Sequence, residues 1–182
     1  MKIETKRLVI RSLALEDEQA FIEMASDGTL TEIYGDCSEC HEWMGRWIKE
    51  SMQLEAENNP NHEYMAFVIE EKSSNRVVGS VGTSYYEDMQ KIGITYFIGS
   101  KFRGHGYAAE AVSAFAEYIF GQYDIGKLIA TVRVRNKASC KTLERAGFIL
   151  TNTGMYQDMY DETAELSNFY ELRRGKMPVP NM

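Results

Sequence analysis

The sequence feature that most constrains the fold is a glycine-rich entry into a periodic helix, at Ser100–Ala111 (SKFRGHGYAAEA). Glycine weakens a helix, so Gly104 and Gly106 indicate that the backbone has a special conformation or a close neighbour there. Apolar residues then recur at helical spacing over residues 107–120, and a strand-like segment, residues 92–99, comes before. One function of such a turn is to let phosphate groups approach main-chain N–H groups at a helix N-terminus.

The rest of the chain alternates between strand-like and helix-like segments, with no repeat, low-complexity region or linker. Its patterns predict strands at residues 7–13, 63–71, 76–86, 92–99, 127–135, 149–156 and 165–173. They predict helices at residues 16–25, 42–56 and 107–120, and a short helix that Asn136 caps and Gly147 ends. The order β-α-α-β-β-β-α-β-α-β-β predicts a mixed α/β fold. We expect a single domain, residues 1–174, and a C-terminal tail, residues 175–182.

Composition limits the possible functions. The chain has 182 residues, of which 27 are acidic and 20 basic, and the net charge of −7 argues against broad nucleic-acid binding. The sequence contains neither a secretory signal nor an apolar run that could span a bilayer, and its three cysteines suit a reducing compartment. We therefore expect a cytoplasmic monomer or homodimer that binds neither nucleic acid nor membrane.

A cysteine motif raises the question of a metal or haem. Cys37, Cys40 and His41 match the C-x-x-C-H pattern of c-type haem attachment, which requires export. A zinc site would need a second pair of ligands, and Cys140 stands alone. We predict neither metal nor haem, and interpret the motif as a coincidence in an acidic loop before a helix.

The glycine stretch has two further interpretations. Gly104 and Gly106 can simply shape a tight connection between strand and helix. Residues 104–109 also fit the dinucleotide-binding pattern G-x-G-x-x-A. That pattern needs its first glycine almost directly after a strand, whereas several residues separate Ile98 from Gly104. It also needs an acidic residue at the end of the next strand, which here ends in VRVRN.

Arg103, Gly106 and Ala108, between a strand and a helix, resemble the acyl-CoA pyrophosphate loop of the GCN5-related N-acetyltransferase (GNAT) superfamily. The resemblance extends over nearly the whole chain. Residues 4–21 (ETKRLVIRSLALEDEQAF) are similar to the start of its RimJ/RimL branch, the ribosomal-protein alanine acetyltransferases. Residues 136–148 (NKASCKTLERAGF) and 165–174 (ELSNFYELRR) resemble two later family segments. The resemblance implies a GNAT-like acyl-CoA N-acyltransferase fold and acetyl-CoA as co-substrate.

The resemblance also implies roles for individual residues. It implies that the pyrophosphate is wrapped by the turn comprising Arg103, Gly104, His105, Gly106, Tyr107 and Ala108, with Arg103 and His105 acting mainly through their N–H groups. It implies that the pantetheine amides pair with the backbone of Tyr96, Phe97 and Ile98, and that Asn136 hydrogen-bonds the pantetheine. Three lysines are either partners of the ribose phosphate or ordinary solvated side chains: Lys101, Lys137 and Lys141.

Acetyl transfer to an amine needs a proton acceptor for the amine and a proton donor for the leaving thiolate. The resemblance places Ser139 near the thioester sulfur as the donor, although a serine there can also simply cap the helix. Many relatives carry a glutamate where this chain has Gly93, so that base is absent. Asp158 is the candidate base, and a solvated turn carboxylate is the alternative reading of it. Glu87, Asp88 and an ordered water chain are other candidates for the base.

We therefore expect an acetyl-CoA-dependent N-acetyltransferase that acts directly on a primary amine, of a small molecule or a protein N-terminus. A covalent route through the Cys140 thiol is a further option. The alternative function is a catalytically silent acyl-CoA-binding protein. Residues 29–61 are expected to shape the acceptor pocket, in which Trp43 and Trp47 either line the wall or pack in the core.

Overall fold

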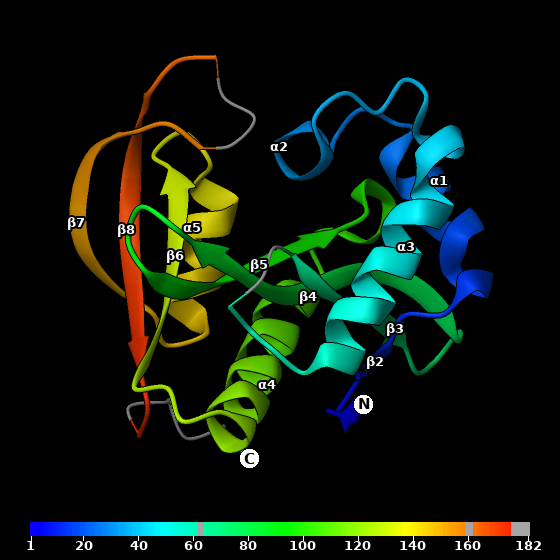
Figure 1. Cartoon of the computed structure of the whole chain (residues 1–182), viewed down its shortest axis with the longest axis horizontal. Helices are drawn as coiled ribbons and strands as arrows, with labels where there is room; N and C mark the ends of the chain where they lie inside the picture. Colours follow the sequence, from blue (N-terminus) through cyan, green and yellow to red (C-terminus); the bar gives the residue numbers. More distant parts are fainter. Residues whose placement is uncertain (62–63, 159–161, 176–182) are drawn as a thin grey trace.

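The computed structural model describes residues 1–61, 64–158 and 162–175. One sheet of eight strands, in the order β1-β2-β3-β4-β5-β6-β8-β7, forms the centre, and helices cover it (Figure 1). The strands are β1 (Lys2–Glu4), β2 (Leu8–Ser12), β3 (Met65–Glu71), β4 (Arg76–Tyr86), β5 (Lys91–Ile98), β6 (Lys127–Arg133), β7 (Ile149–Tyr156) and β8 (Glu165–Arg173). The helices are α1 (Glu18–Ala25), α2 (Thr31–Tyr34), α3 (Cys40–Glu57), α4 (Tyr107–Gln122) and α5 (Lys137–Arg145).

The predicted mixed α/β fold is confirmed, and the predicted strands and long helices all form within a few residues of their expected ends. One short strand and one short α-helix were not predicted. Strand β1 has three residues and helix α2 has four, too few for a periodic pattern to appear in the sequence. Of the predicted tail, only Gly175 lies within the described residues, and residues 176–182 lie outside them.

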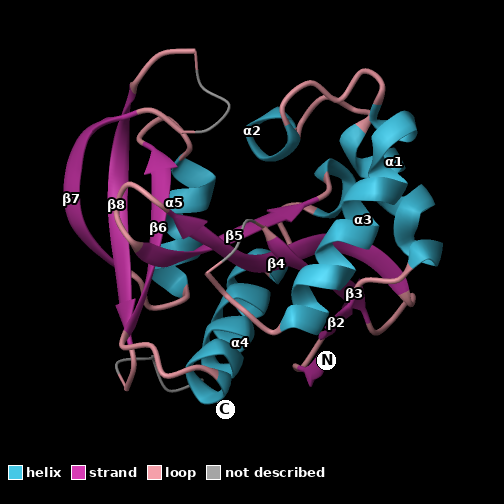
Figure 2. Ribbon diagram, viewed as in Figure 1, coloured by secondary structure: helices cyan, strands magenta, loops and turns pink. Residues whose placement is uncertain are grey.

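The sheet divides between β5 and β6. Strands β1 to β5 pair antiparallel, as do β6, β8 and β7, whereas the parallel contact between β5 and β6 is a single pair, Gly93 with Ile129. Beyond this pair the two strands diverge, which Figure 2 shows as two groups of arrows running in different directions. The side of β5 that faces β6 is therefore left without a strand partner over most of its length.

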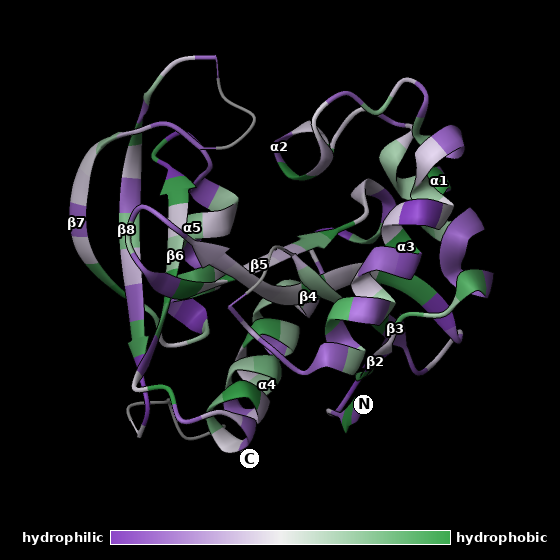
Figure 3. Cartoon of the chain, viewed as in Figure 1, coloured by the Kyte–Doolittle hydropathy of each residue, from purple (hydrophilic) through white to green (hydrophobic). Residues whose placement is uncertain are grey.

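Two apolar clusters hold the helices to opposite faces of the sheet. On one face, α4 contributes Val112, Phe115 and Ile119, all fully buried. On the other, Phe21 from α1 and Met44 from α3 are fully buried. Along α3, hydrophilic and hydrophobic residues alternate, as expected for a helix with one buried side (Figure 3). Among the described residues, no helix is both long and apolar enough to cross a membrane.

A largely buried ion pair fixes the entry to α1. Two nitrogens of Arg11 donate to the two carboxylate oxygens of Asp17 at 2.8 and 2.9 Å, and Asp17 is only 4% exposed. Asp17 also accepts a hydrogen bond from the Ala14 backbone N–H at 2.9 Å, while Arg11 Nε donates to Glu70 at 3.0 Å. The bonds to Asp17 raise the pKa of the Arg11 guanidinium above its ordinary value.

Candidate active site

The glycine turn before α4 has the special backbone conformation that the sequence predicts. Gly104 and Gly106 have φ values of +84° and +77°, in the left-handed region that favours glycine. Gly106 is the N-cap of α4, so the first N–H groups of this helix lack partners within it. A Cβ atom at Gly106 would meet only the Arg7 guanidinium, at 3.5 Å. The conformation therefore requires glycine here, and the turn presents free N–H groups to an anion.

Arg7, the residue before β2, holds this turn in place. Its Nη1 atom donates to the His105 carbonyl at 2.7 Å, and its Nη2 atom pairs with Glu110 at 2.7 Å. The guanidinium also lies 4.9 Å from the centre of the Tyr107 ring. Sequence analysis missed this role of Arg7, because almost a hundred residues separate it from the turn.

The side chain of Arg103 is directed away from the turn. Its Nε atom donates to the Ile98 carbonyl at 3.0 Å, and its Nη2 atom donates to Thr29 Oγ1 at 3.1 Å. The Arg103 backbone N–H donates to the Ser100 carbonyl at 3.4 Å, so the group through which the resemblance implies that Arg103 acts already has a partner in this structure. Because the Ile98 carbonyl accepts the bond from Arg103 Nε, the backbone group that Ile98 can still offer to a ligand is its N–H.

Alternate residues of β5 direct their backbone N–H and C=O groups into the divide, the gap between β5 and β6 beyond the pair of Gly93 with Ile129. The Gly99 N–H, just after β5, donates to the Val78 carbonyl of β4. In this antiparallel pair, the odd-numbered residues of β5 therefore point their N–H and C=O groups toward β4. The polar backbone groups of Tyr96 and Ile98 point the other way, toward the space between β5 and β6. Phe97 faces Ser80 of β4, and its side chain is buried. Of the three predicted pantetheine partners, two have the required orientation.

The N-terminus of α5 lies across the divide from β5. The Asn136 side chain accepts a hydrogen bond from the Ser139 N–H at 3.1 Å, which confirms the predicted cap. The Tyr96 hydroxyl lies 2.7 Å from Ser139 Oγ and donates to the Ser139 carbonyl at 3.2 Å. Burial raises the pKa of Tyr96 to about 12, and the hydrogen bond to Ser139 acts in the opposite direction. Tyr96 therefore keeps its proton at neutral pH.

A cavity of about 760 Å³ opens beside this pair of hydroxyl groups. Four predicted site residues line it: Tyr96, Asn136, Ser139 and Asp158. Asp158 is an exposed residue just beyond β7, on the far side of the divide from α3. The glycine turn is not part of the cavity wall; it lies at the start of α4, the helix that packs against β5. The structure thus separates the predicted residues into the glycine turn and the lining of the cavity.

Gly93 has a specific neighbour in the pocket. A Cβ atom at this position would lie 2.2 Å from Cε2 of Tyr86, because the Tyr86 ring fills the space above the glycine. The Tyr86 hydroxyl lies 3.2 Å from Thr131 Oγ1 on β6. Burial raises the pKa of Tyr86 to about 12, with the negative charge of Asp158 a smaller contribution in the same direction. A tyrosine ring thus occupies the place of a side chain at position 93, which sequence analysis did not foresee.

Trp43 and Trp47 both pack in the core and line the cavity wall, the two interpretations that the sequence left open. They are partly buried and pack against the apolar cluster under α1 and α3, and both also line the cavity. Tyr34 of the short helix α2 connects them, with ring centres 5.6 Å from Trp43 and 5.1 Å from Trp47.

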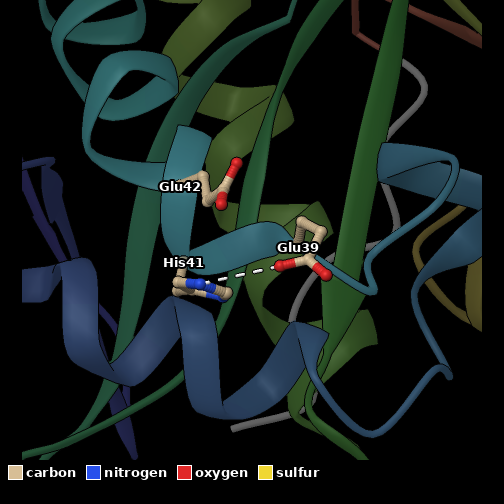
Figure 4. Close-up of side chains that lie close together, drawn as sticks. All are labelled: Glu39, His41 and Glu42. Carbon is tan, nitrogen blue, oxygen red and sulfur yellow. Dashed lines mark ion pairs between the residues drawn. The ribbon is translucent and has the colours of Figure 1, made fainter.

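The residues of the C-x-x-C-H motif point in different directions. The Cys37 and Cys40 thiols are buried, whereas His41 is exposed. His41 instead lies with Glu39 and Glu42 at the exposed start of α3, where its Nε2 atom is 3.6 Å from a Glu39 carboxylate oxygen (Figure 4). Exposed groups of this kind are common without a metal.

The family comparison covers most of the chain. Residues 7–149 match the model of the acetyltransferase (GNAT) domain. An uncharacterized N-acetyltransferase, p20 of Bacillus licheniformis, is 26% identical over 172 residues, which are 91% of each protein. A second, YnaD of Bacillus subtilis, is 24% identical over 147 residues, 81% of this chain and 82% of YnaD.

A solved structure has the same fold. RimL, a ribosomal L7/L12 alpha-N-protein acetyltransferase in complex with coenzyme A, superposes with a TM-score of 0.80. The match covers 95% of this chain and 98% of RimL, at 17% sequence identity. Because the family match spans well over half of the sequence and the architecture agrees with it, this chain belongs to the GNAT acetyltransferase domain family.

Proposed function

We propose that the protein is an acetyl-CoA-dependent N-acetyltransferase, a single domain of residues 1–174, that moves the acetyl group directly to a primary amine. The observation that carries the proposal is the position of Ser139. Its hydroxyl, held by Tyr96, lies at the mouth of the divide between β5 and β6, next to a polar cavity. Membership of the family and the coenzyme A in the RimL structure support acetyl-CoA as donor.

The chain offers fitting partners for the donor. The turn of residues 103–108 has two glycines at positive φ and the free N–H groups of the α4 N-terminus, which suit a pyrophosphate. The outward-facing backbone of Tyr96 and Ile98 suits the amides of an extended pantetheine arm. Asn136, whose oxygen caps α5, donates one N–H of its side-chain amide to Glu32 at 3.5 Å and retains the other N–H for the same arm. Acetyl-CoA, when bound there, supplies an activated thioester.

The reaction forms a C–N bond between the amine and the acetyl carbonyl carbon and breaks the C–S bond of the thioester. Because an alkylammonium has a pKa of about 10, the amine must first give up one proton. A second proton leaves the nitrogen during transfer, and the departing thiolate gains one. We assign the donation to Ser139. The one proton of the Tyr96 hydroxyl can bond either the Ser139 carbonyl or Ser139 Oγ; when it turns to Oγ, the serine proton is free to reach the sulfur, and a proton from solvent then restores the serine hydroxyl.

The proton acceptor is proposed to be Asp158, or water held among the exposed carboxylates of the cavity. Asp158 lines the pocket, and its charge acts on Tyr86, which covers Gly93. Position rather than residue type decides between a carboxylate and a water as base. Replacing Asp158 with Asn should lower kcat and leave the affinity for acetyl-CoA unchanged; an unchanged kcat assigns the proton transfer to water.

The experiment that tests the proposal is turnover of isotope-labelled acetyl-CoA with a broad panel of amines, followed by mass spectrometry of the product and titration of released thiol. Amine-dependent transfer of label supports the enzyme. Tight binding of acetyl-CoA with no transfer to any amine would instead identify the silent binding protein. We further propose a cytoplasmic location, which the three free, buried cysteines support.

A further inference from the structure

The walls of the acceptor cavity carry a distinctive combination of aromatic rings and carboxylates. We infer that the acceptor is an aliphatic diamine or polyamine, a molecule with at least two ammonium groups joined by methylene chains. This inference rests on the proposed function, because it concerns the amine that approaches Tyr96 and Ser139 through the 760 Å³ cavity.

One wall of the cavity is a continuous group of aromatic rings. Tyr34 contacts Trp43 and Trp47, and Trp47 in turn lies 5.8 Å from the ring of Tyr64. All four residues line the cavity. Aromatic faces attract ammonium groups through their quadrupole and give methylene groups an apolar surface. A flexible alkylamine would therefore find contacts along this wall for both its charged and its uncharged parts.

Carboxylates line the cavity on both sides of the divide. One set comes from α2, the following loop and α3: Glu32, Asp36 and Glu50. A second set comes from the turn between β4 and β5 and from the residues after β7: Glu87, Asp88 and Asp158. Figure 1 shows these elements on opposite sides, α2 and α3 facing β6, β7 and β8 across β5. Two separated negative regions match two separated positive groups in one ligand.

The charge of the cavity is not cancelled by its own cations. Its two lining arginines are Arg46 and Arg133. Arg133 pairs with Glu32 at 2.6 Å and with Glu165 at 3.3 Å, and Arg135, outside the cavity wall, lies 3.6 Å from Glu32. Arg46 approaches Glu50 only to 4.0 Å. Within the described part of the chain, Asp36, Glu87 and Asp88 have no ion-pair partner.

The chemistry of the reaction explains why a second ammonium group matters. The attacking nitrogen must be uncharged when it reaches the thioester, so it loses the ion-pair attraction to carboxylates that held it as an ammonium group. A second amine with a pKa of about 10 stays protonated and can remain bound to the acidic wall throughout. The second charge thus supplies binding that a monoamine of the same length lacks.

The first test compares matched acceptors by labelled acetyl transfer. 1,4-Diaminobutane is compared with butylamine, 1,5-diaminopentane with pentylamine, and spermidine with a short peptide that has a free N-terminus. We expect kcat/KM to be at least about tenfold higher for each diamine than for its monoamine. The KM of the diamines should rise with salt concentration, because screening weakens the attraction to exposed carboxylates.

The second test removes charge from the cavity. The double variant Glu87→Gln, Asp88→Asn should raise the ratio of the diaminobutane KM to the butylamine KM about tenfold and flatten the salt dependence of the diaminobutane KM. The ratio is the readout because Glu87 and Asp88 are also candidates for the base, whose loss would affect both amines alike. The control is Glu39→Gln, Glu42→Gln, which removes the same charge from the exposed start of α3, outside the cavity wall. This control should keep both the KM and the salt dependence of the parent.

The outcomes distinguish a failure of the diamine inference from a failure of the proposed acetyltransferase function. Acetylation of monoamines or of the peptide at least as efficient as that of diamines would overturn the diamine inference and leave the acetyltransferase standing. Equal effects of the cavity and control variants would also overturn it. No transfer to any amine by a protein that binds acetyl-CoA would refute the proposed function itself.

Discussion

The Tyr96 hydroxyl on β5 lies 2.7 Å from the Ser139 hydroxyl on α5, and so joins the two elements across the divide in the sheet. Tyr96 is a positioning residue in this arrangement, since it acts through Ser139. Replacing it with Phe should lower kcat about five- to tenfold, as expected for one lost hydrogen bond of about 1 kcal/mol. Acetyl-CoA affinity should stay the same. Tyr118→Phe, on α4 outside the cavity, is the control and should have no effect on kcat.

The pH dependence of this variant tests whether the Tyr96 hydroxyl stays protonated while it orients Ser139. Burial raises the pKa of Tyr96 to about 12, so its hydroxyl remains protonated well above the ordinary tyrosine value. The ratio of wild-type to Tyr96→Phe kcat should therefore stay constant up to about pH 10, where a free tyrosine would be half ionised. A ratio that falls toward one below this pH would show that the hydroxyl titrates normally and has another role.

The Gly106 backbone is predicted to be essential for donor binding. Gly106→Val forces a β-branched residue into φ +77°, at a destabilisation of about 1–3 kcal/mol. In a protein that still folds, calorimetric titration should show acetyl-CoA binding lost, since the side chain obstructs the turn. Gly121→Ala, near the end of the same helix, has open space and should stabilise the protein by about 0.5–1 kcal/mol with binding intact. Normal affinity in folded Gly106→Val would remove the turn from the binding site.

The sequence predicts the glycine turn and the cap because both depend on local backbone chemistry. Gly104 and Gly106 mark a left-handed backbone wherever the turn lies in the fold, and Asn136 caps α5 through an N–H three residues away. Contacts across the sheet follow different rules. Tyr96 contacts Ser139, and Arg7 contacts His105, only once the order and register of the strands are set. The local sequence around each residue does not reveal that order.

The most instructive difference concerns Gly93. From the sequence, the glycine in place of a family glutamate predicts only that a base is missing. The structure adds that the Tyr86 ring fills the vacated space. Tyr86 reaches this position through the β4–β5 hairpin, where it pairs with Lys91, and not through any feature of the sequence around Gly93. A substitution alone does not reveal which neighbour compensates for it.

The packing of Tyr86 on Gly93 predicts energetic coupling between the two. Gly93→Ala places a methyl group 2.2 Å from the Tyr86 ring and should destabilise the protein by about 1–3 kcal/mol. In a Tyr86→Ala background the same change should cost clearly less, about 1 kcal/mol or below, because the ring is gone and the remaining close neighbour is the Ile129 carbonyl oxygen at 3.3 Å. Urea unfolding of the four proteins measures this cycle. Additive effects would mean that the ring does not occupy the site in solution.

The ion pair at the entry to α1 is predicted to matter for stability. Asp17→Ala leaves Arg11 and the Ala14 N–H without their shared carboxylate and should lower the free energy of unfolding by about 3 kcal/mol. Asp124→Asn, which weakens the pair between a fully exposed Asp124 and a half-exposed Arg174, is the control and should leave stability nearly unchanged. A loss as small as that of the control would show that the Asp17 pair contributes no more than a surface bridge.

The central claim is that Ser139 acts on the departing thiolate, and its most direct measurement is kcat together with the dissociation constant of acetyl-CoA for Ser139→Ala. We predict that kcat falls by about 10²–10⁴-fold, the usual contribution of a general acid, while the dissociation constant stays within twofold of the parent, about the error of such a measurement. A near-normal kcat with weakened acetyl-CoA binding would contradict the account and make the Ser139 hydroxyl a binding group instead.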